Sequence, residues 1–209
     1  MPRAERIPLL HAVTDDAAVA RAGFVERAEE VLAAGGARVA LHLRAHGASG
    51  RTLHGIAARL AERARETGSL LLVNDRVDVA LAAGAHGVQL GRRSLSVADA
   101  RRLVGALLIG ASAHDEGEGR EAVEAGADFL VAGAVYPTAT HPGQPGDGLG
   151  LIESVAVLGV PVIAIGGVTP ERAGELRRAG AMGMAVIRGV WDALSPAGAV
   201  QRYIDAWQS

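Results

Sequence analysis

The sequence predicts an α/β protein, a compact single-domain (β/α)8 TIM barrel spanning residues 1–209. Three observations indicate this fold. Short apolar runs alternate eight times with helical stretches, which is the pattern of parallel βαβ units. Four helical stretches end in an Ala-Gly pair that leads straight into an apolar run, as expected when a left-handed glycine closes a helix. The length of 209 residues suits one barrel with few insertions.

The predicted elements follow this alternation along the chain. The expected strands are Leu9–Thr14, Val39–Arg44, Leu70–Asn74, Gly87–Leu90, Leu108–Ser112, Phe129–Ala132, Val162–Ile165 and Met184–Ile187. The expected helices are Val19–Ala34, Leu53–Thr67, Val77–Ala83, Val97–Val104, Glu118–Ala125, Ile152–Leu158, Pro170–Ala179 and Ala197–Trp207. An open doubly wound sheet is the alternative. It is disfavoured because the first strand runs into Asp15-Asp16 and not into the Gly-x-Gly turn of a dinucleotide-binding fold.

Composition excludes several classes of function. The chain has no cysteine, which rules out disulfides, thiolate metal sites and a cysteine nucleophile. Its formal net charge of -2 argues against a nucleic-acid partner. No apolar run is long enough for a transmembrane helix, and the charged start Met1–Arg6 does not resemble a signal peptide. We therefore expect a cytoplasmic protein without a membrane or nucleic-acid partner.

The sharpest local motif is Gly166-Gly167-Val168-Thr169-Pro170, which follows the seventh predicted strand. Pro170 suits the first turn of a helix, and Thr169 is expected to be its N-cap. Amides at such a position bind anions, and the loops after strands seven and eight of a barrel often bind phosphate. The motif therefore predicts a phosphate site.

Polar residues after other strands are further candidates, because barrel active sites lie at the carboxyl ends of the strands. His42, Arg44 and His46 alternate, so they share one face and suggest an anion site around the Arg44 cation. Zinc is disfavoured there, since one strand supplies at most two good ligands and no carboxylate is adjacent. His11 has no identifiable partner and is expected to be structural or exposed.

Two more candidates could carry chemistry. Ser112-Ala113-His114 follows the fifth strand, and His114 suits proton transfer near neutral pH. Ser112 is not in a Gly-x-Ser-x-Gly turn, so acyl chemistry is disfavoured. Asp75 either binds Mg²⁺ or caps the helix that begins at Val77, and the sequence leaves both alternatives open.

Together these residues resemble the thiamin-phosphate synthase superfamily over nearly the whole chain. The similar segments are Leu10–Asp16, Asn74–Ala80, Val88–Gly91, Gly110–His114, Gly133–Thr138 and Ala164–Pro170. The resemblance implies a barrel that handles the phosphorylated thiazole half of thiamin. The superfamily has a synthase branch, which couples hydroxymethylpyrimidine diphosphate to thiazole phosphate with Mg²⁺, and a metal-free tautomerase branch called TenI.

Three departures from the synthase pattern favour the TenI branch. Two lysines of that pattern are His46 and His141 here, and its second metal-binding aspartate is Ser94. Whether Arg92 or Arg93 replaces the lost lysines is left open. Losing a metal ligand and two cations should weaken diphosphate departure, because each charged hydrogen bond contributes about 1.5–3 kcal/mol.

We therefore expect a thiazole tautomerase, an isomerase that aromatises a carboxythiazole phosphate without metal or cofactor. The resemblance implies His114 as the acid–base group and Arg44 as the carboxylate partner. The other substrate-binding residues expected are His42, Asn74, Ser112, Thr138 and Thr140, and the phosphate-binding ones are Gly166, Gly167, Val186 and Ile187.

Two alternatives stay open beside this expectation. The first is a transferase, a thiamine-phosphate synthase with Mg²⁺ at Asp75. The second is a non-catalytic regulatory or ligand-binding barrel. The physiological ligand is open if the pathway is incomplete in the source organism. A homodimer is also open, with Val190–Trp191 and Trp207 as candidate contact residues.

Overall fold

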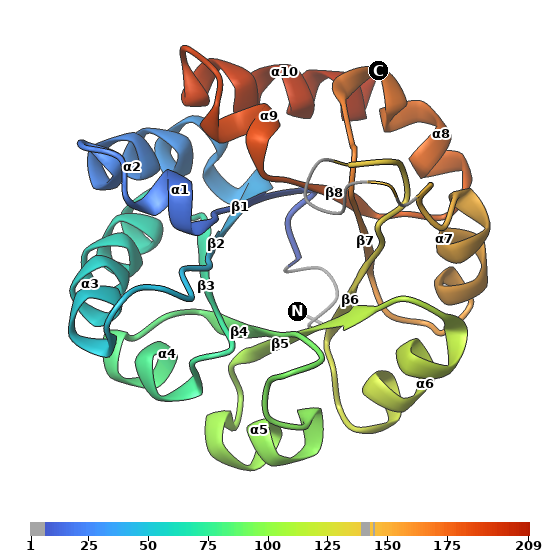
Figure 1. Ribbon diagram of the computed structural model, residues 1–209, viewed down its shortest axis with the longest axis horizontal. Coiled ribbons are helices and arrows are strands. Elements are labelled where there is room, and N and C mark those ends of the chain that lie inside the picture. The colour runs from blue at the N-terminus through green and yellow to red at the C-terminus, as the bar shows by residue number, and fades with distance from the viewer. Residues whose placement is uncertain (1–6, 139–142, 144) are drawn as a thin grey trace.

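Eight parallel strands close into a barrel in this computed structural model, which describes residues 7–138, 143 and 145–209. The ring closes because β8 pairs with β1 as well as with β7. Figure 1 shows the ring of strands with helices arranged around its outside. The strands are β1 (Leu10–Val13), β2 (Val39–Leu43), β3 (Leu70–Asn74), β4 (Gly87–Leu90), β5 (Leu108–Ala113), β6 (Phe129–Ala132), β7 (Val162–Ile165) and β8 (Gly183–Val186). The predicted barrel is confirmed, and the open-sheet alternative is excluded.

The helices alternate with the strands along the chain and surround the ring on its outside (Figure 1). The α-helices are α1 (Asp16–Val19), α2 (Phe24–Gly35), α3 (Gly50–Thr67), α4 (Val77–Ala83), α5 (Val97–Val104), α6 (Glu116–Glu124), α7 (Leu149–Ala156), α8 (Ala173–Arg178), α9 (Arg188–Trp191) and α10 (Pro196–Gln208). Two short 3-10 turns are η2 (Gly36–Arg38) and η3 (Pro170–Arg172). Within the described ranges, no helix is both long enough and apolar enough to cross a membrane.

Two predicted helices are divided and one helix was not predicted, whereas α3, α6, α7 and α10 differ from their predicted bounds by one to three residues. The stretch Val19–Ala34 is split into α1 and α2, because Gly23 adopts a left-handed conformation with φ of 71° between them. The stretch Pro170–Ala179 begins as the 3-10 turn η3 before it becomes α8, and Thr169 makes no side-chain capping bond there. The short helix α9 was not predicted, since four residues are too few to show a helical period.

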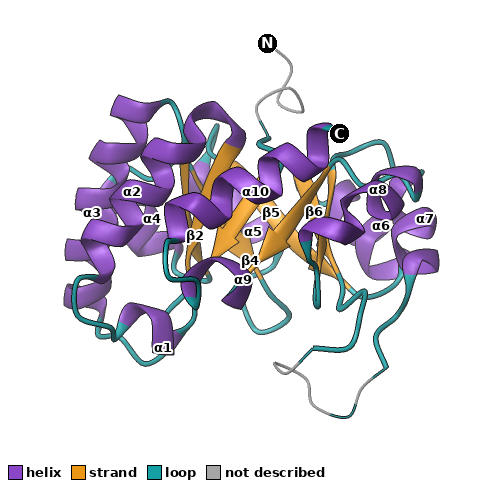
Figure 2. Ribbon diagram, turned by 90° about the horizontal axis from the view of Figure 1, so that it is seen from above, coloured by secondary structure: helices purple, strands orange, loops and turns teal. Residues whose placement is uncertain are grey.

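Side chains along each strand alternate between two hydrophobic clusters, as the period of a strand requires. In β6, Leu130 belongs to the larger cluster beneath the helices, whereas Phe129 and Val131 belong to the smaller one inside the barrel. Ile7 joins the inner cluster, so its side chain helps to close the amino-terminal end of the barrel. The helices α1 and α9 follow the carboxyl ends of β1 and β8, and Figure 2 shows both at the same end of the barrel.

The barrel interior also holds polar side chains, and glycine makes room for them. A Cβ built on Gly110 would overlap Gln89 Oε1 and Phe129 Cζ. His11 contacts the same Phe129, with ring centroids 5.4 Å apart. The interior therefore has no space for even one additional methyl group at Gly110.

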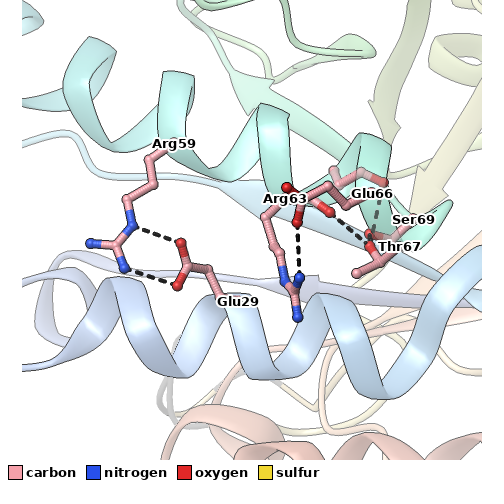
Figure 3. Close-up of polar contacts among 7 residues, drawn as sticks. Glu29, Arg59, Arg63, Glu66, Thr67 and Ser69 are labelled. Carbon is pink, nitrogen blue, oxygen red and sulfur yellow. Dashed lines mark hydrogen bonds and ion pairs between the residues drawn. The ribbon is translucent and has the colours of Figure 1, made fainter.

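Helices α2 and α3 lie side by side, and Figure 3 shows an ion pair between Arg59 of α3 and Glu29 of α2. Arg59 donates from Nε to Glu29 Oε1 at 2.6 Å and from a terminal nitrogen to Glu29 Oε2 at 2.9 Å. Arg63 donates to Glu66 at 2.9 Å within α3. Exposed pairs of this kind contribute about 0–1 kcal/mol each, so apolar packing remains the main attachment of these helices.

The residues expected to form a dimer surface are buried inside the chain itself. Val190, Trp191 and Trp207 are 0%, 4% and 8% exposed. Trp191 packs against Phe24, and its Nε1 donates to the Val13 carbonyl oxygen at 2.7 Å. These residues anchor the carboxyl-terminal segment to β1, so they are not free for a partner. The homodimer stays a prediction without a defined surface.

Replacing Gly110 with alanine should destabilise the barrel, because the new methyl group displaces Gln89 or Phe129. We expect the free energy of unfolding to fall by about 1–3 kcal/mol in urea denaturation followed by circular dichroism. Gly55→Ala is the matched control, since a Cβ at Gly55 in α3 meets nothing within 4 Å. That variant should gain about 0.5–1 kcal/mol from helix propensity. Equal stability of Gly110→Ala and the wild type would contradict the packing argument.

Candidate active site

A cavity of about 590 Å³ opens at the carboxyl ends of the strands. Its volume suits a small-molecule ligand. All eight strands or the loops that follow them contribute side chains or backbone to the lining. The position agrees with the general location of active sites in this fold.

The cavity brings together nearly all the residues that the sequence analysis singled out. The predicted residues that line it are His42, Arg44, His46, Asn74, Asp75, Ser112, His114, Thr138, Gly166, Gly167, Val186 and Ile187. Thr140 and His141 lie outside the described residues. Arg92 and Arg93 also line the cavity, as do Gln89 and Arg188, to which the sequence analysis assigned no role. Arg188 could have been found from its place directly after the predicted phosphate loop.

Two residues of the cavity lining carry buried side-chain carbonyl oxygens that lack a partner in the described part of the chain. Among the described residues, Asn74 Oδ1 and Gln89 Oε1 are buried and accept no hydrogen bond. The amide nitrogen of Gln89 donates weakly to Ser112 Oγ at 3.3 Å and to the Leu90 carbonyl oxygen at 3.4 Å. An unsatisfied buried acceptor costs about 1–3 kcal/mol. The floor of the cavity, formed by the strand residues His42, Asn74, Gln89 and Ser112, therefore favours a ligand that donates hydrogen bonds.

His42 belongs to a buried histidine pair. Its Nε2 lies 2.7 Å from His11 Nδ1, and His11 Nε2 lies 3.0 Å from the Pro8 carbonyl oxygen. Burial lowers the pKa of His11 to about 4, against a weaker raising effect of the Pro8 hydrogen bond. Burial also lowers the pKa of His42 well below 6.5, and repulsion from His11 adds to this. His42 is thus neutral at pH 7, so it does not add a positive charge to the anion site predicted around Arg44. His11 was expected to have no partner, but it contacts His42.

Arg44 is positioned by the end of β1. The Thr14 hydroxyl donates to the Arg44 carbonyl oxygen at 2.9 Å and accepts from the Arg44 amide at 2.8 Å. The hydroxyl thereby extends the hydrogen bonding between β1 and β2 by one residue beyond the end of the strands. The Arg44 guanidinium lines the cavity as the permanent cation that the sequence predicts.

Asp75 is one of the residues that line the cavity, and its carboxylate does not cap a helix. Its backbone is left-handed, with φ of 64°, which is strained for a residue other than glycine. Its Oδ1 accepts from the Ser94 hydroxyl and from the Gly91 amide, and its Oδ2 is 3.8 Å from His46 Nδ1. Helix α4 begins instead after Arg76, without a side-chain cap.

The residues around Asp75 fit a Mg²⁺ ion shared with a ligand, but not a metal site made by protein alone. In the part of the chain that the structure describes, no three His, Asp or Glu side chains are grouped closely enough to hold a metal ion. Protein Mg²⁺ sites commonly use one or two carboxylates together with substrate phosphates and water. Asp75 can supply one such carboxylate, whereas Ser94 contributes only a neutral hydroxyl.

His114 and Arg92 both bind Glu118, on the first turn of α6. His114 Nδ1 donates to Glu118 Oε2 at 2.9 Å, and Arg92 donates to Glu118 Oε1 at 2.5 Å. Burial alone would raise the pKa of Glu118, but hydrogen bonds from His114 and Arg92 lower it. Arg92 is therefore compensated by a carboxylate. Arg93 and Arg188 line the cavity without such a carboxylate partner in the described chain.

The Gly166-Gly167 loop approaches the backbone that follows β6. Both glycines have positive φ, at 97° and 63°. A Cβ on Gly166 would lie 2.6 Å from Ala134 Cα, and one on Gly167 would lie 2.6 Å from the Pro137 carbonyl oxygen. Arg172 donates to the Gly167 carbonyl oxygen at 2.6 Å and holds the loop from the other side. The glycines are therefore needed for packing, and this packing leaves the loop lining the cavity.

Comparison with known proteins agrees with this geometry. The thiamine monophosphate synthase family matches residues 10–190. A thiamine-phosphate synthase of Mycolicibacterium vanbaalenii is 39% identical over 90% of this chain and 89% of its own length. The bifunctional thiamine biosynthesis protein ThiM/ThiE of Symbiobacterium thermophilum is 46% identical over 71% of this chain, which spans only 32% of that protein. A solved structure, the thiamine phosphate pyrophosphorylase of Pyrococcus furiosus, has a TM-score of 0.83 at 33% identity and covers 99% of this chain and 97% of its own.

These comparisons overturn the expectation of a thiazole tautomerase. Relatives named thiamine-phosphate synthase are 35–43% identical over 70–97% of this chain. The prediction gave too much weight to His46, His141 and Ser94, taken one position at a time. Arg44, Arg93 and Arg188 line the cavity, so the three departures do not remove its cationic character.

The buried histidine pair should make the fold sensitive to mild acid. As pH falls from about 6.5 toward 4, the unfolded chain binds protons that folded His11 and His42 exclude, so the free energy of unfolding falls. Each such histidine contributes a slope of up to about 1.4 kcal/mol per pH unit. In urea denaturation between about pH 7 and pH 5, His11→Phe should show a shallower slope than the wild type. His54→Gln, at an exposed site on α3, is the matched histidine control, and a slope in His11→Phe equal to that of the wild type would contradict the assignment.

Proposed function

This chain belongs to the thiamine monophosphate synthase family, and on that premise we propose that it is a thiamine-phosphate synthase. Such an enzyme joins the ring nitrogen of thiazole phosphate to the methylene carbon of hydroxymethylpyrimidine diphosphate. The carbon–oxygen bond to the diphosphate breaks, and its electron pair leaves with the diphosphate. The similarity to synthases over most of the chain is the observation that carries the proposal.

The charges around the cavity support this transferase. Both substrates are anions, and the leaving diphosphate gains negative charge as the carbon–oxygen bond breaks. Arg44, Arg93 and Arg188 line the cavity, and arginine binds phosphate oxygens in a bidentate manner. Preorganised cations next to developing charge are among the largest contributions to catalysis. We assign to these arginines the work that the lysines of the family pattern would do.

The thiazole phosphate is proposed to bind at the loops after β7 and β8. Gly166, Gly167, Val186 and Ile187 line that side of the cavity, and Arg188 follows them directly. The residues of these two loops carry backbone amides, and Arg188 adds a cation. Loops at this position are a frequent phosphate site in barrels.

Asp75 is proposed to hold Mg²⁺ together with the diphosphate of the pyrimidine substrate. When bound there, Mg²⁺ supplies charge neutralisation for the leaving diphosphate. Ser94 and Gly91 donate hydrogen bonds to Asp75 Oδ1 and orient the carboxylate.

The direct test is a coupling assay with hydroxymethylpyrimidine diphosphate, thiazole phosphate and Mg²⁺. Thiamine phosphate should appear in chromatography, and one pyrophosphate should be released for each thiamine phosphate formed. Chelation of the metal should stop the reaction. No thiamine phosphate above the protein-free background would overturn the proposal.

Asp75→Asn should lower turnover by about 10²–10³-fold, because it removes the carboxylate while keeping the shape of the side chain. Its thermal unfolding should stay close to that of the wild type. Ser94→Asp should lower the Mg²⁺ concentration needed for half-maximal rate, since it adds a second carboxylate beside Asp75. Ser94→Ala is the control for losing the hydroxyl alone. A Mg²⁺ requirement that is the same in Ser94→Asp and the wild type would argue against metal binding at this position.

A further inference from the structure

We propose that His11 is a positioning residue that holds His42 in a single tautomer, so that His42 presents Nδ1 to the cavity as a bare acceptor for a hydrogen-bond donor of the substrate. The inference rests on the proposed function only for the identity of that substrate. His11 is fully buried and does not line the cavity, whereas His42 does. His11 therefore acts through His42.

The tautomers follow from counting protons along a short chain of hydrogen bonds. The Pro8 carbonyl oxygen can only accept, so His11 Nε2 must carry a hydrogen. A neutral His11 then has a bare Nδ1. The 2.7 Å contact between His11 Nδ1 and His42 Nε2 needs one hydrogen, and only His42 Nε2 can supply it. A neutral His42 is thereby left with a bare Nδ1.

Both rings remain neutral because, among the described residues, no carboxylate contacts either ring to compensate a positive charge. His11 and His42 are 0% and 1% exposed, and both pack against the ring of Phe129. Burial of a charged imidazole in such surroundings is strongly unfavourable. Near neutral pH, each of the two rings therefore carries one hydrogen, on Nε2, and has a bare Nδ1.

His42 Nδ1 adds a third acceptor to the cavity floor. Asn74 Oδ1 and Gln89 Oε1 are the other two, and neither has a partner in the described protein. His42 Nδ1 makes no hydrogen bond within that part of the chain either, so it is available to a ligand. In the opposite tautomer His42 would offer an N–H at the same place and would repel an N–H donor. His11 thus determines whether this part of the floor accepts or donates.

Acceptors on the floor distinguish the two substrates of the proposed reaction. Hydroxymethylpyrimidine diphosphate carries an exocyclic amino group, whereas thiazole phosphate has no N–H donor. A site built to pair with a polar group discriminates strongly against a partner that lacks it. Loss of the His42 tautomer should therefore weaken binding of the pyrimidine substrate and not of the thiazole phosphate.

The first experiment reads the tautomers in the wild type without any turnover. Long-range proton–nitrogen correlation spectra of protein with nitrogen-15-labelled histidine separate protonated from bare ring nitrogens. The His42 signals are those that disappear in His42→Gln. We expect protonated Nε2 and bare Nδ1 in both His11 and His42 near neutral pH. A protonated Nδ1 in His42, or a doubly protonated ring, would overturn the proposal even if the protein is an active synthase.

Adding each substrate separately tests what His42 Nδ1 recognises. Hydroxymethylpyrimidine diphosphate should shift the Nδ1 signal upfield, as expected when a bare nitrogen accepts a hydrogen bond, and thiazole phosphate should leave it in place. This readout does not depend on catalysis, so it separates failure of the inference from failure of the synthase assignment. An unchanged signal with saturating pyrimidine diphosphate would overturn the recognition role.

The second experiment uses two substitutions of His11 that differ in one property. Gln offers a carbonyl acceptor for His42 Nε2 and an amide donor for Pro8, whereas Phe keeps the bulk and offers neither. We expect His11→Phe to raise the KM for the pyrimidine diphosphate by at least about 10-fold, with the KM for thiazole phosphate changed by less than about 2-fold. His11→Gln should restore the wild-type KM, and the exposed-site variant His54→Gln is the control. Equal KM values in His11→Phe and the wild type, or equal losses in His11→Phe and His11→Gln, would overturn the proposal.

Discussion

Closure of the sheet, through the pairing of β1 with β8, is the constraint on which the rest of this structure depends. Once the ring is closed, every second side chain of each strand must fit inside it, and the helices must cover the outside. This requirement explains why the strands are buried along nearly their whole length. It also explains Gly110, where the interior side chains of two other strands take the space of a Cβ.

Closure of the ring also gives the cavity two regions of different charge, with uncharged side chains at its floor and arginines at its rim. Side chains that project from the strands themselves are deeply buried, so only uncharged groups such as His42 and Gln89 are tolerated there. Residues that follow the strands, such as Arg44 and Arg188, remain near solvent and keep their charge. A ligand with an uncharged hydrogen-donating ring at one end and phosphate at the other matches this gradient. The two halves of the proposed chemistry are thus separated by depth in one cavity.

The mistaken expectation of a tautomerase has a physical explanation. Comparing motifs position by position treats each lost lysine as a lost charge at a fixed place. A cavity, however, responds to the sum of its charges, and arginines from loops far apart in the sequence can contribute to the same field. Arg93 lies in the loop after β4 and Arg188 begins α9 after β8, and only the closed ring brings them to one cavity. Arg92 has the same sign, but its ion pair with Glu118 neutralises much of its effect.

The sequence by itself determined the repeating plan of this protein. The alternation of apolar runs with helical stretches and the glycines that end the helices are local signals, and they placed all eight strands within a residue or so of their observed bounds. Because residues after the strands of a barrel share one end, most of the cavity lining could also be predicted, including Arg44, Asp75 and His114. Only the tertiary structure decided which atoms meet. His11 and His42 are 31 residues apart, and Val13 and Trp191 are 178 apart, so no local pattern records either contact. Burial and hydrogen bonding across the closed barrel, and not residue type, make His42 a neutral acceptor where the sequence suggested a cation.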